Sequence, residues 1–316
     1  MRLIRSLLTL LTLVVVAALV VAAAPQPVAA AEREVTLTIQ TVVDNPSRSP
    51  ATVTLNIPLL SDTSSPYQTL VAESFNPKPV EIKTTANGRT ATFEVRVPAG
   101  QSVTIEERYV LAIRSYERPE AGEHRLSAAE RTLYLRAEKG IEADDATLRK
   151  VAARATEGVQ GAGAAAERVF SFVRGHLRYD GNSRARNQGA LAAYEAGSGV
   201  CQEFASLFVA LMRASGVPAR VVNGYVLLDA NGHLTTQGIA QRVRHQWAEY
   251  FDPAYGWVPV DPTFAASPED SLTRPAYVRQ NFGDRPITGK ATGGQVKVSR
   301  GATVTETPVQ TALQQP

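Results

Sequence analysis

The chain has 316 residues, of which 44% are hydrophobic and 20% charged, and its formal net charge is +3. This composition is typical of a globular protein with a sizeable core, and the length favours two domains over one. No stripe of Lys and Arg with interleaved aromatic residues is present, so no nucleic-acid partner is expected. The net charge alone does not identify a ligand.

The first 31 residues have the pattern of a secretory signal peptide. Arg2 and Arg5 precede an apolar run at residues 7–24, and small residues follow at 29–31. This arrangement predicts cleavage after Ala31. An uncleaved membrane anchor is the alternative, because the apolar run approaches the roughly 20 residues that span a bilayer. In both cases we expect the rest of the chain to be exported, either secreted or held at the cell envelope.

Residues 32–114 are expected to form an antiparallel β-sandwich. Apolar and polar residues alternate at 35–39, 52–57 and 92–97, and turn signals such as Asn87-Gly88 separate these runs. Alternation with period two, interrupted by such turns, is typical of short antiparallel strands. No nucleophile, metal-ligand set or phosphate loop occurs in this region, so its predicted role is structural or adhesive.

The residue pattern changes after a predicted linker at residues 115–125. Helices are expected after Asp144-Asp145, at 164–178 and from Cys201, and strands at 220–226, 245–251 and 257–260. Helices followed by such strands indicate an α+β domain over residues 126–290. Beyond it, Gly, Thr, Gln and Pro dominate. Residues 291–316 are therefore predicted to be a poorly ordered tail, with at most one edge strand at 295–299.

Cys201 is the single cysteine of the chain, so it cannot form a disulfide within it. An exported protein that relied on disulfides would carry cysteines in pairs. The thiol is therefore either a small buried hydrophobe or a group whose chemistry is used. A run with helical spacing follows it, in which the apolar residues are Phe204, Leu207, Phe208 and Leu211.

The predicted position of Cys201 is the first turn of that helix, behind Gly197 and Gly199. The positive end of the helix dipole and the free N–H groups there favour a thiolate. The same N–H groups can stabilise an oxyanion, and glycines let the backbone come close to a substrate. This position favours a nucleophile over a core cysteine.

A thiolate nucleophile needs a base, and the base needs an orienting partner. Of four histidines, His245 alone lies on an alternating strand whose neighbour ends in an acidic residue, Asp261. Turn-like residues at 252–256 predict a hairpin that brings the two side chains together. A structural role for His245, and a turn-initiating role for Asp261 before Pro262, remain open on this evidence.

Four segments in this order resemble the transglutaminase-like superfamily. They are Gly-x-Gly-x-Cys at 197–201, Leu-Met-Arg-Ala-Ser-Gly-Val-Pro-Ala-Arg at 211–220, His-x-Trp-x-Glu at 245–249 and Gly-Trp-Val-Pro-Val-Asp-Pro-Thr at 256–263. The resemblance covers residues 133–283 and includes Arg178-Tyr179. One departure is Gln246, where a small residue is common in the family. We expect its side chain to point to the opposite face from His245.

This resemblance implies a papain-like core in which Cys201 attacks an amide carbonyl to form a thioester. His245 would carry the proton and Asp261 would hold the imidazole. A protein or peptide substrate is implied, with acyl transfer to an amine or hydrolysis as the outcome, and no cofactor or metal. Exported bacterial members similarly place a β-rich domain ahead of such a core.

Two other functions compete with this one. The protein could be a non-catalytic cell-surface binding or adhesion protein that works through the β-sandwich. Alternatively, Cys201, His245 and a carboxylate could hold a metal, although no closely spaced ligand pair such as Cys-x-x-Cys is present. Near the motifs, Trp247 and Tyr179 are expected to be packing residues and Glu249 a partner for an arginine.

Overall fold

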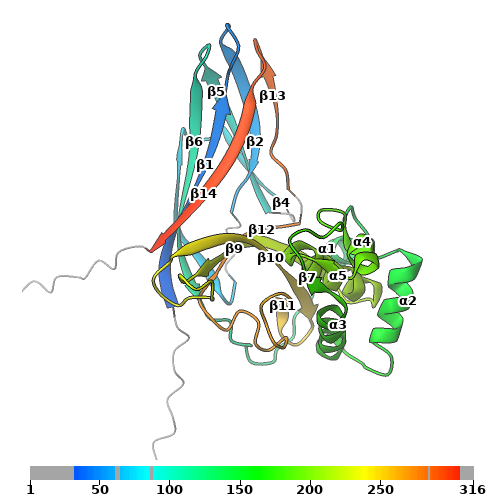
Figure 1. The fold of residues 1–316 in the computed structure, drawn as a ribbon. Helices are drawn as coiled ribbons and strands as arrows, with labels where there is room; N and C mark the ends of the chain where they lie inside the picture. The colour runs from blue at the N-terminus through cyan, green and yellow to red at the C-terminus, as the bar shows by residue number, and fades with distance from the viewer. Residues whose placement is uncertain (1–31, 61–64, 86–87, 284, 307–316) are drawn as a thin grey trace, which may run out of the picture.

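The computed structural model describes residues 32–60, 65–85, 88–283 and 285–306, in an elongated β-sandwich above a part that mixes helices and strands (Figure 1). The predicted signal peptide and its cleavage site, residues 1–31, lie outside the described residues. No helix among the described residues is long and apolar enough to cross a bilayer.

Two four-stranded antiparallel sheets form the sandwich, as the alternation predicts. Their strand orders are β14-β1-β6-β3 and β13-β2-β5-β4. The strands are β1 Glu32–Asp44, β2 Ala51–Pro58, β3 Gln68–Asn76, β4 Glu81–Thr85, β5 Gly88–Val97, β6 Ser102–Arg114, β13 Thr288–Thr292 and β14 Lys297–Glu306. Apolar side chains at alternate positions fill the space between the sheets.

The predicted tail, residues 291–316, is more ordered than expected: its edge strand, expected at 295–299, is observed at 297–306 and is longer. β13 pairs with β2, and β14 pairs with β1 over ten residue pairs, so each sheet gains an edge strand from the C-terminal segment. The composition of this segment is polar, but an open sheet edge supplies backbone hydrogen bonds that composition does not reveal. Val304 is buried there, which anchors the strand.

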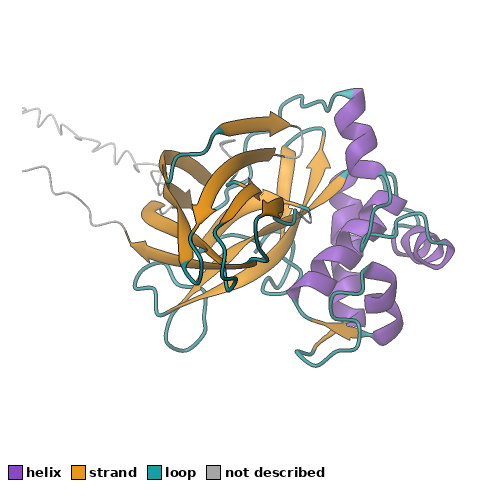
Figure 2. Cartoon of the chain, turned by 90° about the horizontal axis from the view of Figure 1, so that it is seen from above, coloured by secondary structure: helices purple, strands orange, loops and turns teal. Residues whose placement is uncertain are grey.

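The mixed part contains five helices and a third four-stranded antiparallel sheet, of order β11-β10-β9-β12, with the helices on one side of it (Figure 2). The elements are α1 Ala128–Leu135, α2 Ala146–Ala155, α3 Ala162–His176, β7 Arg178–Tyr179, α4 Ala190–Ala196, β8 Ser198–Gly199, α5 Cys201–Ala214, β9 Ala219–Leu228, β10 Gln241–Asp252, β11 Gly256–Val260 and β12 Tyr277–Phe282. The predicted α+β class is confirmed. The predicted linker forms neither helix nor strand.

Helix α5 lies at the centre of this part. Every residue from Glu203 to Arg213 is buried, and the helix packs against β9, β10 and the other four helices. Its end follows the sequence signals: Gly216 has a φ of 82°, which favours glycine, and Pro218 prevents continuation. A helix buried on all sides holds its first residue, Cys201, in a fixed place.

One hydrophobic core joins the sandwich to the mixed part. It contains Val35 and Leu37 of β1 together with Leu207 and Phe208 of α5. Tyr67, at the sandwich end of this core, is buried and donates a hydrogen bond to Glu249 Oε1 across 2.6 Å. The sandwich is therefore packed into the mixed part and is not a detachable module.

Candidate active site

The loop before α5 is held by a short parallel pair of strands. Ser198 and Gly199 of β8 pair with Arg178 and Tyr179 of β7. Val200 then has extended backbone at the N-cap, and α5 begins at Cys201, which is half-buried. The first N–H groups of a helix lack intrahelical acceptors. The predicted first-turn position of the thiol is therefore observed.

Glu203, two residues after Cys201, is a buried carboxylate that the sequence did not single out. Its two oxygens accept hydrogen bonds from the backbone N–H of Val200, across 3.0 Å, and of Asn187, across 2.9 Å. A Cβ at Gly199 would lie 2.3 Å from Cβ of Glu203. The open space at this glycine thus admits the Glu203 side chain, whereas the sequence suggested that it admits substrate.

The predicted hairpin of β10 and β11 brings His245 and Asp261 together. The two strands pair from Ala248 opposite Val260 to Asp252 opposite Gly256. Nε2 of His245 lies 2.8 Å from Oδ2 of Asp261, and both side chains are buried. The other ring nitrogen of His245 is not used by Asp261, and Cys201 is close enough to raise the pKa of the imidazole.

The Asp261 carboxylate is also held by groups outside the hairpin. Tyr277 of β12 donates its hydroxyl to Oδ2 across 2.8 Å, and the backbone N–H of Thr263 donates to Oδ1 across 2.9 Å. The backbone N–H of Asp261 itself donates to Oγ of Ser271 across 3.0 Å. A buried carboxylate needs such donors to remain charged.

Burial and charge act in opposite directions on this pair. Burial alone lowers the pKa of His245, but the Asp261 carboxylate and the Cys201 sulfur raise it more, from 6.5 to about 9. Burial raises the pKa of Asp261, yet the imidazole and the hydrogen bonds from Tyr277 and Thr263 leave it below 3.8. The arrangement favours an imidazolium next to a carboxylate.

Aromatic rings surround the His245 imidazole. Trp247 stacks near it with ring centroids 6.1 Å apart, and Phe264 meets it edge-on at 5.0 Å. Trp247 is fully buried, as its predicted packing role requires, but Tyr179 is 60% exposed and does not pack into the core. Burial, and secondly the charge of Cys201, raise the pKa of Tyr179, so this exposed ring is within electrostatic range of the thiol.

The other candidate residues lie away from this arrangement. His176 contacts the backbone carbonyl of Tyr194 across 2.7 Å, and His233 is exposed near Asp229. Glu249 does pair with an arginine, Arg220, across 2.6 Å. Within residues 32–60, 65–85, 88–283 and 285–306, no group of three or more His, Cys, Asp or Glu side chains could hold a metal ion.

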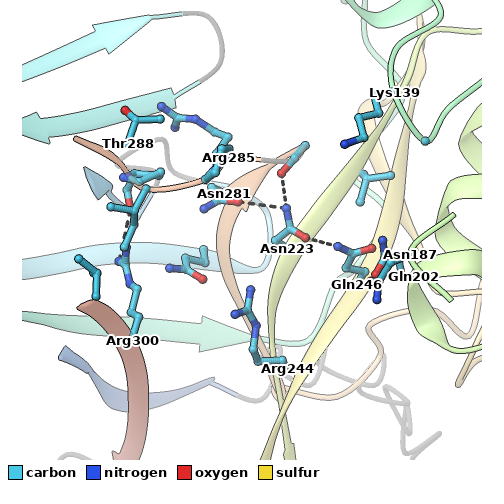
Figure 3. A pocket seen from close by; sticks show the side chains of 18 of the residues that line it. Lys139, Asn187, Gln202, Asn223, Arg244, Gln246, Asn281, Arg285, Thr288 and Arg300 are labelled. Atoms are coloured by element: carbon cyan, nitrogen blue, oxygen red, sulfur yellow. Dashed lines mark hydrogen bonds between the residues drawn. The ribbon is translucent and has the colours of Figure 1, made fainter. Parts of the chain in front are cut away.

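A large cleft is next to this site but separate from it. It has a volume of about 1340 Å³ and is lined by residues of the sandwich, of the sheet β9-β10-β12 and of the first turns of α5 (Figure 3). Gln246 lies in this cleft, on the face opposite to His245, as predicted. Cys201, His245 and Asp261 do not line it, although Gln202 does.

Part of the chain is similar to a known family. Residues 149–262 match the model of the Transglutaminase-like superfamily. A crystal structure from Cytophaga hutchinsonii, whose assignment as a cysteine protease is itself provisional, has a TM-score of 0.57 and 16% identity. The match covers 86% of this chain and 91% of that one, which shows a common fold.

Two curated relatives match over shorter segments. The protein-glutamine gamma-glutamyltransferase of Pseudomonas aeruginosa is 39% identical over 80 residues, which is 24% of this chain and 11% of the relative. The uncharacterized protein YebA of Bacillus subtilis is 34% identical over 74 residues, 22% of this chain and 10% of that one. The chain spans about a tenth of the length of these relatives. The predicted resemblance is confirmed.

Proposed function

Because the chain carries a domain of the transglutaminase-like superfamily, we propose that it is an exported cysteine enzyme that forms a thioester on Cys201. Its substrate is a peptide or protein amide, and Asp261 and His245 complete the catalytic set. One observation supports this above the others: the buried His245 ring is hydrogen-bonded to the Asp261 carboxylate, and Cys201 is close enough to raise the pKa of the imidazole.

The first half of the reaction breaks the amide. The Cys201 thiol gives its proton to His245, and the resulting thiolate attacks the carbonyl carbon to form a C–S bond. The N–H groups at the start of α5 stabilise the negative oxygen of the tetrahedral intermediate. His245 then protonates the leaving nitrogen as the C–N bond breaks. Asp261 keeps the imidazole oriented and stabilises its charged form.

The second half releases the acyl group. Either a primary amine or water attacks the thioester carbonyl, gives its proton to His245, and displaces the Cys201 sulfur. An amine gives a new amide, and water gives a carboxylic acid. The name of the Pseudomonas aeruginosa relative favours transfer to an amine. A non-catalytic adhesion role would not explain why His245 and Asp261 form a buried, hydrogen-bonded pair.

Mass spectrometry of the intact protein tests the proposal. The protein is incubated with glutamine-containing peptides, with and without a primary amine. The mass of the protein is followed, and any increase is assigned to Cys201 by peptide mapping. An acyl adduct on Cys201 is expected, with a released amide product when the amine is present and an acid when it is absent. His245→Gln should lose the adduct, whereas His233→Gln, an exposed control, should keep it. Failure of the unaltered protein to form any adduct with any donor would refute it.

Export is part of the proposal and has its own test. The basic and apolar residues at 1–31 support it. N-terminal sequencing of the protein recovered from outside the cytoplasm should start at Glu32. Recovery of the whole chain in the cytoplasm would contradict export, and a membrane-bound chain that starts at Met1 would favour the anchor.

A further inference from the structure

The cleft between the sandwich and the mixed part carries an excess of free positive charge. Arg242 and Arg244 line it from β10, Lys139 from the loop before α2, and Lys290 from β13, and all four are exposed. In the part of the chain that the structure describes, none of the four has a carboxylate within ion-pair distance. Arg242 and Arg244 are two residues apart on one strand, so their side chains share the cleft face.

The acidic residues of the cleft do not offset this charge. Glu138 forms an ion pair with Arg213 across 2.8 Å. Glu142 accepts a hydrogen bond from the backbone N–H of Ala190 across 2.9 Å, at the start of α4. Glu138 is therefore paired with a cation and Glu142 is engaged at a helix start, so the four exposed cations outnumber the one carboxylate without a cationic partner and favour an anionic ligand.

A row of side-chain amides crosses the floor of the same cleft, from Asn281 through Asn223 to Gln246 (Figure 3). The orientation of the row is fixed at one end, because Nδ2 of Asn223 donates to the backbone carbonyl of Gly283, which can only accept. Oδ1 of Asn223 must then accept from Nε2 of Gln246, across 2.5 Å. This leaves Oε1 of Gln246 as a free acceptor.

That free acceptor is buried and has no hydrogen-bond partner among the described residues. A buried oxygen without a donor is costly, so the position favours a ligand that brings an N–H group. Gln202, the residue after Cys201, lines the cleft beyond the Gln246 end of the row (Figure 3). The row therefore leads towards the nucleophile.

The molecule itself contains an example of an amide side chain that binds a peptide unit. Gln68 donates from Nε2 to the carbonyl of Arg279 across 2.9 Å and accepts at Oε1 from the N–H of the same residue across 2.7 Å. Asn and Gln side chains in the cleft can recognise a bound backbone in the same way.

We propose that this cleft binds an extended acidic peptide, namely the stretch of the substrate next to the reactive amide. The substrate backbone lies along the amides of Asn223 and Gln246, and its carboxylates lie against Arg242 and Arg244. The chain then passes Gln202 to reach Cys201. This inference rests on the proposed function, because it places the reactive amide at the sulfur.

Binding can be measured without chemistry in the full chain carrying Cys201→Ala. The probe is a fluorescein-labelled peptide with one glutamine flanked by glutamates, and its partner has serines in place of the glutamates. Fluorescence anisotropy gives the affinity of each. The variant Arg242→Glu/Arg244→Glu is compared with Arg149→Glu/Lys150→Glu, an equal charge change on the exposed face of α2, away from the cleft.

The acidic peptide should bind more tightly than the serine peptide, and added salt should weaken it. Its affinity should fall about tenfold in Arg242→Glu/Arg244→Glu, since two exposed charge contacts are reversed, and should change little in the control pair. Equal binding of the two peptides, or equal loss in both charge variants, would overturn the proposal. So would binding of dextran sulfate in the cleft without binding of the acidic peptide. Acyl-adduct formation by the unaltered enzyme is a separate readout, so a failure of the chemistry is distinguishable from a failure of the cleft.

Discussion

Tyr277 donates its hydroxyl hydrogen to Oδ2 of Asp261 across 2.8 Å, and the same oxygen accepts a hydrogen bond from Nε2 of His245. The two donors come from different strands, β12 and β10, and meet at the end of β11. Tyr277 is therefore a positioning residue that acts through Asp261 and fixes the direction in which its carboxylate faces the imidazole.

Replacement Tyr277→Phe should slow alkylation of Cys201 by iodoacetamide about tenfold at neutral pH, because a buried carboxylate that loses a donor costs about 1–3 kcal/mol. The missing donor also makes Asp261 more basic, so the acid limb of the pH profile should move to higher pH. Tyr250→Phe removes a hydroxyl from another buried tyrosine and should leave the profile unchanged. A Tyr277→Phe profile identical to that of the unaltered protein would show that the contact is only structural.

Alkaline pH should destabilise the protein through His245. Its pKa in the folded state is raised from 6.5 to about 9, so its contribution is fully present below pH 6.5 and is lost as pH rises through about 9. Asp261 has a lowered pKa, so its contribution is present above 3.8 and is lost as the pH falls. Urea unfolding across this range should show the alkaline slope in His233→Gln but not in His245→Gln. An unchanged slope in His245→Gln would assign the effect to other groups.

Loss of the Glu249 charge should destabilise the whole molecule. Glu249 is buried between Tyr67 of the sandwich side and Arg220 of β9, so Glu249→Gln leaves Arg220 without its carboxylate. Breaking a buried ion pair from one side costs about 3–5 kcal/mol. Chemical denaturation should show this loss in a single transition, whereas exposed Glu94→Gln should change stability by less than about 0.5 kcal/mol. Two separate transitions would show that the sandwich and the mixed part unfold independently.

The same packing predicts that a chain lacking residues 32–114 will not fold. Removal of these residues takes away Tyr67, which contacts Glu249 and whose ring centroid lies 6.5 Å from that of Trp247. It also exposes the shared core to solvent. Circular dichroism and limited proteolysis should find no stable fragment. A soluble, cooperatively folded fragment would contradict the single core.

Gly199→Ala should disturb the approach to the nucleophile. The added methyl group would lie 2.3 Å from Cβ of Glu203 and displace the carboxylate from the N–H groups of Val200 and Asn187. We expect a loss of about 1–3 kcal/mol of stability and slower alkylation of Cys201. Gly175→Ala is the control: it lies in α3 with nothing within 4 Å and should be neutral or stabilising. Equal stability and equal alkylation rates of the two variants would show that Glu203 does not hold the loop before Cys201.

The parts of the site that local patterns govern could be predicted. Helical spacing and a terminating glycine placed Cys201 at the start of α5, and a turn between two alternating strands brought His245 to Asp261. These signals act over a few residues, so they can be recognised in a single sequence.

The parts that depend on which strands pair could not be predicted. Tyr277 reaches Asp261 only because β12 pairs with β9, and no local sequence signal near Tyr277 indicates that β9 is the partner strand. The polar composition of β14 predicts a poorly ordered tail, whereas the order of this strand comes from the edge of β1, more than 250 positions earlier in the sequence. Likewise, the free oxygen of Gln246 follows from hydrogen bonds that join three strands.

The pairing of β14 with β1 has a consequence for how the protein is made. One wall of the cleft consists of β13 and β14, the last strands of the described chain to be synthesised, and their partners β1 and β2 are the first. Contacts between such distant segments form late, because the intervening chain must first be closed into a loop. A growing chain therefore has no complete cleft until β13 and β14 have been synthesised and have paired with β2 and β1.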